Sequence, residues 1–417
     1  MLKYYVKSFL INIFCFFIFK SSYRKLIRRS LQTKYIPYKS IDENALAYFE
    51  NIELQKQFIY ESKKDINKKN ILFIARLGKI GGIETRILKT IPTLEKYFNI
   101  FILSPIDHYK YIDLIKQKNI FTYQTNFLRN PDNLTLFIKK IIAIHNIDIV
   151  EFEYGYFWQL NYKELKINNA KLVGAFHHHL DHHRDNTINN HIYKELNNFD
   201  AVIKIKENLG LPTHHNSHII SNGVIEIKNY YQLNNSKNCL IISRISKDKL
   251  KSITKFIEFA IKNNINPILA GFIDNKKIYN FLQKKYNLKN ENFIGYINTI
   301  SHLKEFNNKY LFICGVAQVP MEAIAFGYPC LTTSESERVA KNNWGLTFVK
   351  KSNWKELYDN NFGIVKNNDG SELSKDFKNI QHNNLEDFKL IDDIKDFLDI
   401  NIINMKYIDI LNNLTNK

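Results

Sequence analysis

Short apolar runs alternate with amphipathic segments along most of this chain, and the alternation occurs in two successive series. Apolar runs of about four to eight residues indicate buried strands, whereas apolar residues three and four positions apart indicate helices. Strands that alternate with helices form a parallel sheet that is covered by helices on both faces. We therefore predict an α/β protein with two Rossmann-like, doubly wound parallel-sheet domains.

The two series and their flanking segments divide the 417 residues, which are many for a single core, into four parts. In the first series, after an apolar run and a helix within 70–94, strands are expected at 98–105, 120–125, 147–155, 170–179, 199–209 and 215–224, and helices at 111–118 and 133–146. In the second series, strands are expected at 238–246, 265–272, 291–297 and 310–315, and helices at 250–263, 276–287 and 302–309. The four parts are a basic, amphipathic helical extension (1–69), a first Rossmann-like domain (70–232), a second one (233–370) and helices that cross back to the first (371–417).

The N-terminal segment joins an apolar stretch, 9–19, to a basic cluster that comprises Lys20, Arg24, Lys25, Arg28 and Arg29. The apolar stretch is about half the ~20 residues that a spanning helix needs, and no small-residue cleavage site follows it. An apolar helix followed by basic residues suits the interface of an anionic membrane. We expect this segment on the inner face of the cytoplasmic membrane; a helix packed on the protein's own body is the alternative.

The formal net charge is +18, from 59 Lys and Arg against 41 Asp and Glu. This charge favours a polyanionic neighbour, such as an anionic membrane or a nucleotide-linked substrate, although a compositional bias towards lysine is the alternative. No module with interleaved aromatic and basic residues is recognised, so we expect no nucleic-acid partner. Four cysteines without any CxxC pair indicate a reducing compartment and no zinc ribbon.

The stretch GVAQVPMEAIAFGYP, 315–329, has the pattern of a loop, a short helix and a stop. Pro320 is tolerated in the first helical turn, where its missing N–H costs nothing. Glu322 lies near the positive end of the helix dipole, and Gly327 followed by Pro329 ends the helix. A helix start of this kind is suited to hold a polar, phosphate-bearing ligand.

Two further segments suggest phosphate chemistry. The loop GKIGGIET precedes a helix, and its Gly81 and Gly82 allow a ligand to approach the backbone closely. A tight strand–helix turn is the alternative, because the loop is neither GxGxxG nor a P-loop. Arg244 and Lys249 follow the first strand of the second series, where such sheets bind ligands. They could neutralise a departing diphosphate, and solvated basic residues are the alternative.

Six motifs in this order resemble those of the retaining glycosyltransferases of family 4, which have the GT-B fold: GGIET, SNGV, SRISKDK, LAGF, FIGYI and MEAIAFGYP. Together they cover about residues 70–335. The resemblance implies two Rossmann-like domains that face a cleft, a nucleotide-sugar donor, a reaction that retains configuration, and no bound metal or other cofactor.

The resemblance also implies roles for individual residues. Arg244 and Lys249 would bind the donor diphosphate, and Glu322 would bind the ribose hydroxyls of the nucleotide and take part in catalysis. Gly81 and Gly82 would form a loop near the phosphates or the acceptor.

The chain departs from the family pattern eight residues before Glu322, where Cys314 stands in place of a first glutamate. A thiol has neither the charge nor the acceptor strength of a carboxylate. We therefore treat Cys314 and Gly315 as uncertain sugar-site residues. Either the donor sugar is recognised differently, or catalysis is altered or lost, and both retention and inversion of configuration stay open.

His177, near the end of an expected strand, matches the family's histidine near the transferred sugar and is a second candidate catalytic residue. It opens the cluster HHHLDHHRD, 177–185, which offers zinc ligands if it is helical. We prefer a place on the acceptor side of the cleft and expect no metal. At another strand end, Glu151, Glu153, Tyr154 and Trp158 would contact sugar rings or pack in the core.

These observations predict a bacterial glycosyltransferase that moves a sugar from a nucleotide-sugar to a glycan or lipid-linked acceptor of lipopolysaccharide or capsule. Membrane anchoring would raise its effective concentration near such acceptors. Two alternatives stay open. One is a non-catalytic GT-B protein that binds nucleotide or glycan, and the other is a related GT-B phosphotransferase or epimerase.

Overall fold

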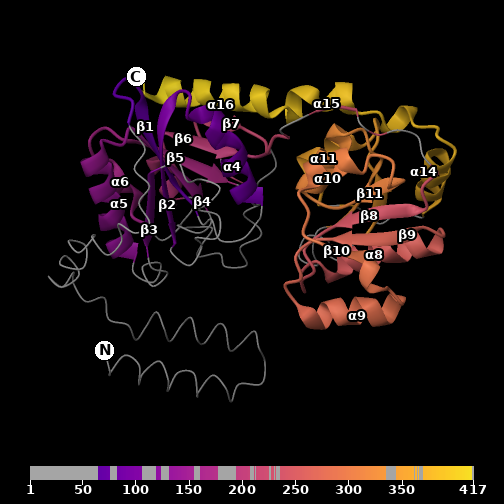
Figure 1. Cartoon of the computed structure of the whole chain (residues 1–417). Coiled ribbons are helices and arrows are strands. Elements are labelled where there is room, and N and C mark those ends of the chain that lie inside the picture. The colour runs from indigo at the N-terminus through magenta and orange to yellow at the C-terminus, as the bar shows by residue number, and fades with distance from the viewer. Residues whose placement is uncertain are drawn as a thin grey trace, which may run out of the picture. The chain divides into compact units, whose positions relative to one another are not determined.

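The computed structural model contains two α/β sheets with helices on their faces (Figure 1). The chain divides into two compact units, Met1–Gln57 and Phe58–Lys417, and every described residue belongs to the second unit. The structure describes residues 64–75, 82–105, 119–123, 131–154, 160–176, 194–206, 211, 213–224, 227–229, 231, 235–334, 344–360, 362–363, 365 and 370–415. The predicted N-terminal helix and its basic cluster lie outside these residues.

The first sheet has seven parallel strands in the order β3-β2-β1-β4-β5-β6-β7. The order reverses at β1, so the sheet is doubly wound and its switch point lies between β1 and β4. Its elements are β1 (Lys69–Ile74), α4 (Gly82–Leu94), β2 (Phe98–Pro105), β3 (Asn119–Tyr123), α5 (Pro131–His145), β4 (Ile149–Tyr154), α6 (Tyr162–Leu165), β5 (Lys171–Phe176), η6 (Leu196–Asn198), β6 (Ala201–Lys204) and β7 (Ser217–Ile219).

Apolar side chains on both faces of the first sheet explain why its strands read as continuous apolar runs. In β1 all four residues of 71–74 are buried, as a strand covered on both faces requires. In α4, the apolar residues Ile87, Ile91 and Leu94 recur at helical spacing and pack on one face of the sheet. Helix α5 lies on the other face (Figure 1).

The second sheet has six strands in the order β10-β9-β8-β11-β12-β13. All its strands are parallel except β13, which pairs antiparallel with β12 at one edge. Its elements are β8 (Asn238–Ile242), α8 (Leu250–Lys262), β9 (Asn266–Ala270), α9 (Lys276–Tyr286), η7 (Asn290–Asn292), β10 (Phe293–Gly295), α10 (Thr299–Glu305), β11 (Phe312–Cys314), α11 (Gln318–Ala325), β12 (Cys330–Thr333), β13 (Leu346–Phe348) and α13 (Trp354–Asp359). The predicted pair of doubly wound sheets is confirmed, with one antiparallel edge strand that the sequence pattern did not indicate.

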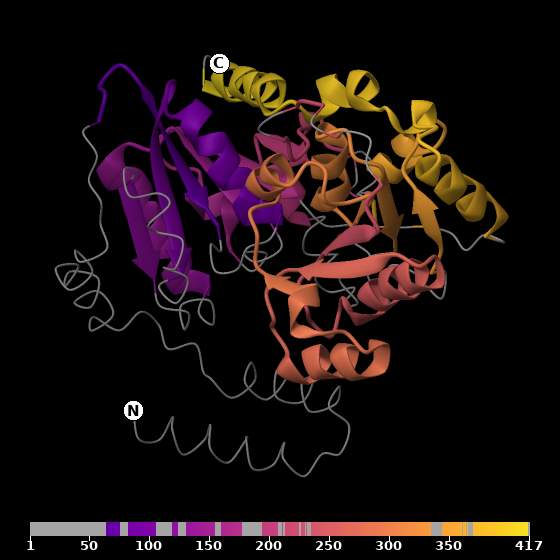
Figure 2. The same ribbon diagram turned by 45° about the vertical axis from the view of Figure 1, so that its right-hand side comes forward.

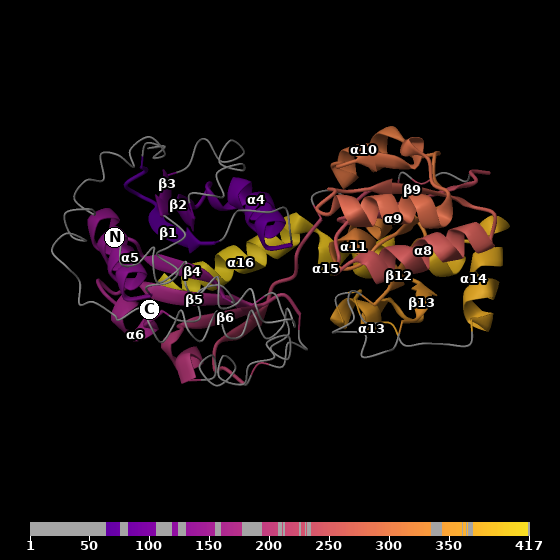
Figure 3. The same ribbon diagram turned by 90° about the horizontal axis from the view of Figure 1, so that it is seen from below.

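The C-terminal helices contribute to both hydrophobic cores. They are α14 (Ser371–Gln381), η8 (Glu386–Phe388), α15 (Ile391–Leu398) and α16 (Ile400–Thr415). Helices α14 and α15 pack in the core of the second sheet, whereas Tyr407 and Leu411 of α16 pack in the core of the first. Helix α16 lies beside α4 (Figure 3), and one extended residue, Asp399, joins α15 to α16. The C-terminal helices are drawn in yellow in Figure 2.

The residues at the junction of α15 and α16 are hydrogen-bonded to the segment that joins the two sheets. The Val224 N–H donates to the Leu398 carbonyl at 2.6 Å, and the Ile400 N–H donates to the Val224 carbonyl at 3.1 Å. A Cβ on Gly223 would lie 2.8 Å from Ile400 Cα, so the close contact requires glycine. The glycine of the SNGV motif is therefore explained by packing against the start of α16.

Three further expectations concern the segment before β1, the helix at 111–118 and a membrane-spanning helix. Residues 64–68, at the end of the expected N-terminal extension, form a turn before β1. The helix expected at 111–118 lies outside the described residues. Among the described helices, none combines the length and apolar character needed to span a bilayer.

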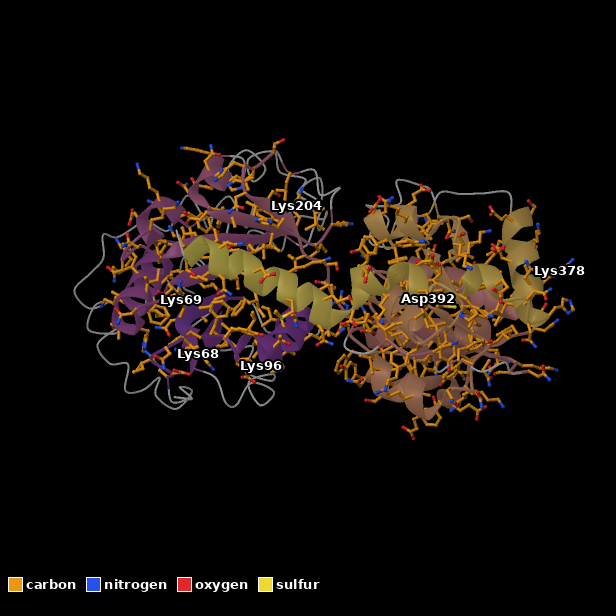
Figure 4. All side chains as sticks on the ribbon, turned by 90° about the horizontal axis from the view of Figure 1, so that it is seen from above. Lys68, Lys69, Lys96, Lys204, Lys378 and Asp392 are labelled. Atoms are coloured by element: carbon orange, nitrogen blue, oxygen red, sulfur yellow. The ribbon has the colours of Figure 1, made fainter. Side chains whose placement is uncertain are left out.

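The end of α16 is held against the start of β1. Lys69 Nζ donates to the Thr415 carbonyl at 2.9 Å (Figure 4).

Candidate active site

Two neighbouring strands of the second sheet, β8 and β11, carry the predicted donor-binding residues just after their carboxyl ends. Cys314, the last residue of β11, pairs with Ile241 of β8, so the two strand ends lie abreast. The strand order reverses here, with β9 and β10 on one side and β12 and β13 on the other. Doubly wound sheets bind ligands at such a switch point. The turn 243–249 and the connection 315–317 therefore both begin at the expected ligand-binding edge.

The side chain of Arg244 is held between two carboxylates at this edge. Its Nη2 lies 3.0 Å from Asp248 Oδ2, and its Nε lies 3.2 Å from Asp274 Oδ2. Burial would raise the pKa of Asp248, but the hydrogen bond from Ser246 and the charge of Arg244 lower it. These two contacts fix the direction of the guanidinium. Because the Arg244 side chain is 37% exposed, it is still accessible to an anion.

Lys249 ends the same turn and stands directly before α8. Its backbone N–H donates to the Ser246 carbonyl at 3.2 Å, and its carbonyl accepts from the Ile253 N–H at 3.0 Å. Its side chain is half-buried. Both predicted diphosphate ligands thus lie on one hydrogen-bonded turn at the carboxyl end of β8.

The connection from β11 to α11 has only three residues, 315–317. A Cβ on Gly315 would lie 2.3 Å from Val319 Cγ1, so a larger residue would force the helix away from the strand. Ala317 has a φ of 58°, a conformation that costs a non-glycine residue of order 1–3 kcal/mol. This tight connection brings the start of α11 close to the strand end.

The thiol of Cys314 is buried in the core of the second sheet and contacts Cys239 on the adjacent strand. Burial, together with the neighbouring thiols of Cys239 and Cys330, raises the pKa of Cys314 well above its ordinary value. A buried neutral thiol is a poor nucleophile and a weak ligand. Cys314 is the last residue of β11 and its thiol lies in the core, so the structure does not place it at a sugar site, whereas Gly315 follows the strand end.

Glu322 of α11 is paired with Lys89 of α4, a residue for which the sequence carries no signal. Lys89 Nζ lies 3.2 Å from Glu322 Oε1 and 3.2 Å from the carbonyl oxygen of Gly223. The two side chains are 8% and 10% exposed. Gln318 Nε2 donates to the same Gly223 carbonyl at 3.4 Å. The candidate ribose-binding carboxylate is therefore part of a cluster of four residues, Lys89, Gly223, Gln318 and Glu322.

The predicted residues of the first sheet lie at, or just beyond, the limits of the described segments. Helix α4 begins at Gly82, and β5 ends at Phe176, directly before His177. Gly81, His177 and the rest of the histidine cluster, 178–185, lie outside the described residues. Among the residues that the structure describes, no three His, Cys, Asp or Glu side chains gather where a metal ion could bind.

Glu151 and Glu153 project from β4 into the core of the first sheet, where both contact Arg86 of α4. Arg86 Nη1 donates to Glu151 Oε1 at 2.8 Å and to Glu153 Oε1 at 2.9 Å. The three side chains are buried, and the guanidinium lies 5.2 Å from the ring centroid of Tyr407 on α16. Burial raises the pKa of Glu151 to about 7, although Arg86 opposes this. These two carboxylates are paired with Arg86 in the core, as the core-packing alternative predicts.

Phe272 and Tyr296 form an exposed stacked pair just after β9 and β10. Their ring centroids lie 4.5 Å apart at an interplanar angle of 20°, and the residues are 47% and 50% exposed. The Phe272 carbonyl accepts from the Ile245 N–H at 2.8 Å, so the pair adjoins the turn that carries Arg244. Exposed aromatic rings of this kind offer a flat face on which a planar group can stack.

No family model and no curated protein matches the chain. Solved structures do match it. HepE of Anabaena, in complex with UDP and glucose, is 15% identical with a TM-score of 0.60, and the match covers 82% of this chain and 99% of HepE. The lipopolysaccharide outer core galactosyltransferase WaaB is 14% identical with a TM-score of 0.57 and the same coverage. A variant of S. aureus TarM in complex with UDP is 13% identical with a TM-score of 0.56, over 82% of this chain and 100% of TarM.

The chain has the GT-B fold. In this GT-B chain, Arg244, Lys249, Gly315 and Glu322 all follow β8 or β11, as their local motifs indicate. Lys89 occupies an ordinary position in a helix, and the exposed aromatic pair follows apolar strands whose sequences look like core. Their place near the candidate site depends on packing between segments that are distant in the sequence, so no short motif predicts it.

Proposed function

We propose that this GT-B protein is a glycosyltransferase that moves a sugar from a nucleotide-sugar to an acceptor. One observation carries the proposal: the turn with Arg244 and Lys249 and the helix with Glu322 follow neighbouring strands at the switch point of the second sheet. Two cations and one carboxylate at such an edge suit a diphosphate and a ribose. HepE and TarM, which share the fold, were solved with UDP.

Within this proposal, each residue has a defined role. Arg244 and Lys249 bind the diphosphate and stabilise its growing negative charge as the bond to the anomeric carbon breaks. Glu322 accepts hydrogen bonds from the ribose hydroxyls, and the aromatic pair Phe272 and Tyr296 offers a stacking surface for the base.

The proposed roles on the first sheet come from the sequence alone. The loop with Gly81 and Gly82 approaches the phosphates or the acceptor, and His177 hydrogen-bonds to the transferred sugar. Because two cations are available to the leaving diphosphate, we expect activity without an added divalent metal.

A panel of nucleotide-sugars tests the function directly. We expect one of UDP-, GDP- or ADP-linked sugars to be hydrolysed or transferred, and its nucleotide to raise the thermal unfolding midpoint. Released nucleotide and sugar are measured by chromatography, with EDTA present in a parallel reaction. The absence of both turnover and a nucleotide-dependent thermal shift over the whole panel would refute the proposal.

We further propose a cell-surface glycan or a lipid-linked glycan as the acceptor, because WaaB, which shares the fold, acts on the outer core of lipopolysaccharide. The basic cluster at 20–29 would hold the protein on the cytoplasmic face of the membrane. The full chain is expected to sediment with vesicles that contain phosphatidylglycerol and not with pure phosphatidylcholine vesicles. Replacement of Arg24, Lys25, Arg28 and Arg29 by alanine should abolish this difference; equal sedimentation of the two proteins would contradict the membrane role.

One observation favours a second candidate, a GT-B protein that binds nucleotide without turnover. The connection 315–317 carries no carboxylate, and Cys314 before it is buried in the strand. A retaining transfer that depends on a carboxylate at this position therefore lacks its group here. Nucleotide binding in the absence of turnover, with acceptor glycans present, would identify this second function, whereas product with retained configuration would exclude it.

A further inference from the structure

Lys89 connects three segments of the chain through one buried ammonium group. Its Nζ contacts Glu322 Oε1 in α11 and the carbonyl oxygen of Gly223 in the segment between the sheets, both at 3.2 Å. Gln318, four residues before Glu322, donates to the same carbonyl at 3.4 Å. Lys89 lies in α4 and is 233 residues from Glu322 in the sequence, so this contact exists only in the folded chain.

Because the Lys89–Glu322 pair is largely buried, a change in either side chain has a large energetic effect. Both side chains are about nine-tenths buried, and breaking one partner of such a pair leaves an uncompensated charge in a poorly solvated place. A carboxylate that binds a ribose diol must present its oxygens in a fixed direction, because hydrogen bonds weaken steeply when they are misaligned. The Lys89 ammonium supplies that direction.

We infer that Lys89 is a positioning residue for nucleotide binding, which acts by holding the carboxylate of Glu322 towards the ribose hydroxyls. This inference rests on the proposed function, because it concerns the same nucleotide site. It assigns no contact between Lys89 and the nucleotide itself. The effect of Lys89 therefore appears only where the ribose hydroxyls are present, which separates it from a general effect on folding.

The test compares two ligands in two proteins by isothermal titration calorimetry. The ligands are whichever of UDP, GDP and ADP binds the wild type most tightly, and the 2′,3′-dideoxy form of that nucleotide. In the wild type, the ribose form should bind at least about 10-fold more tightly, as expected for hydrogen bonds to a charged group. In Lys89→Met, this preference should fall to about 2-fold or less, with the affinity for the dideoxy form unchanged within about 2-fold, because only the oriented carboxylate is lost.

Lys96→Met is the matched control, because Lys96 lies two residues beyond the end of the helix of Lys89 and is exposed (Figure 4). It should keep the wild-type preference for ribose. Lys89→Arg retains the charge and should restore part of the preference. If Lys89→Met does not fold by circular dichroism, Lys89→Gln, which keeps a donor for Gly223, carries the same comparison.

The outcomes separate this inference from the proposed function. If the wild type binds none of the nucleoside diphosphates, the proposed function fails and the inference fails with it. If the wild type prefers ribose and the Lys89 variant keeps that preference, the inference alone is overturned. Equal weakening of both ligands in the variant would likewise overturn it, because that result indicates a general structural role.

Discussion

Replacement of Lys249 by alanine is expected to lower the turnover of the nucleotide-sugar about 100- to 1,000-fold, with a smaller effect on the affinity for the donor. Negative charge on the diphosphate grows as the glycosidic bond breaks, so a cation beside it stabilises the transition state more than the bound donor. Lys249 and Arg244 lie on one turn at the carboxyl end of β8, where a cation that stabilises the diphosphate would lie. The measurement is kcat and KM for the donor that the panel identifies.

Lys247→Ala is the control for this prediction, because Lys247 belongs to the same turn and is exposed. Its removal changes the net charge of the protein by the same amount and should leave kcat within about 2-fold of the wild type. Equal losses in the two variants would indicate a diffuse electrostatic effect. Wild-type turnover in Lys249→Ala would show that the diphosphate binds elsewhere.

Replacement of Arg86 by methionine is expected to lower the free energy of unfolding by about 3–5 kcal/mol, because it removes the cation from a buried cluster. Glu151 and Glu153 are both fully buried and both accept hydrogen bonds from Arg86 Nη1. Methionine preserves most of the length and the apolar contact with Tyr407, so the loss reports charge and not volume. Urea unfolding followed by circular dichroism at about pH 8 measures it.

Glu151→Gln is the matched variant, and its effect has the opposite sign. Burial raises the pKa of Glu151 from 4.5 to about 7; Arg86 of α4 opposes this shift, and Glu153 adds to it. Tyr407 of α16 also lies beside Arg86. Between these two values the folded protein holds a proton that the unfolded chain has lost. The stability that comes from this proton is fully present below about pH 4.5 and is lost as the pH rises through about 7.

Glutamine keeps an acceptor for Arg86 and leaves one carboxylate to balance the guanidinium. We therefore expect Glu151→Gln to be more stable than the wild type at about pH 8, by roughly 1–3 kcal/mol, and to lose less stability between about pH 5 and 8. The same urea titrations at both pH values provide the comparison. A variant less stable than the wild type at pH 8 would contradict a raised pKa at Glu151.

The sequence pattern predicted most of the fold because the strands of both sheets are buried on two faces. The run expected at 98–105 coincides with β2, and the helix expected at 250–263 differs by one residue from α8. Such strands have no exposed face to interrupt the apolar run. Strand β13 has only three residues and pairs with β12 in the opposite direction, so neither length nor periodicity could indicate it.

The candidate site was predictable only where a local motif places the residue. Arg244, Lys249 and Glu322 follow strand ends, and the position of a strand end can be read from the pattern. The position eight residues before Glu322 could be read from the motif, but not that its side chain, the thiol of Cys314, is buried in the core at the end of β11. Whether the last side chain of a strand faces the core depends on how the neighbouring strands and helices pack, which the pattern does not contain.

By itself, the sequence determined the two doubly wound sheets and the residues at the ends of β8 and β11. The alternation of apolar runs with helices, and the order in which strands and helices follow one another along the chain, are local properties. Only the tertiary structure decided that Lys89 pairs with Glu322 and that Arg86 sits between Glu151 and Glu153. The partners in these pairs are 233 residues apart in one case and 65 and 67 residues apart in the other. A charged side chain in a helix has the same local pattern whether it faces water or a buried carboxylate, and only the packed core makes the difference.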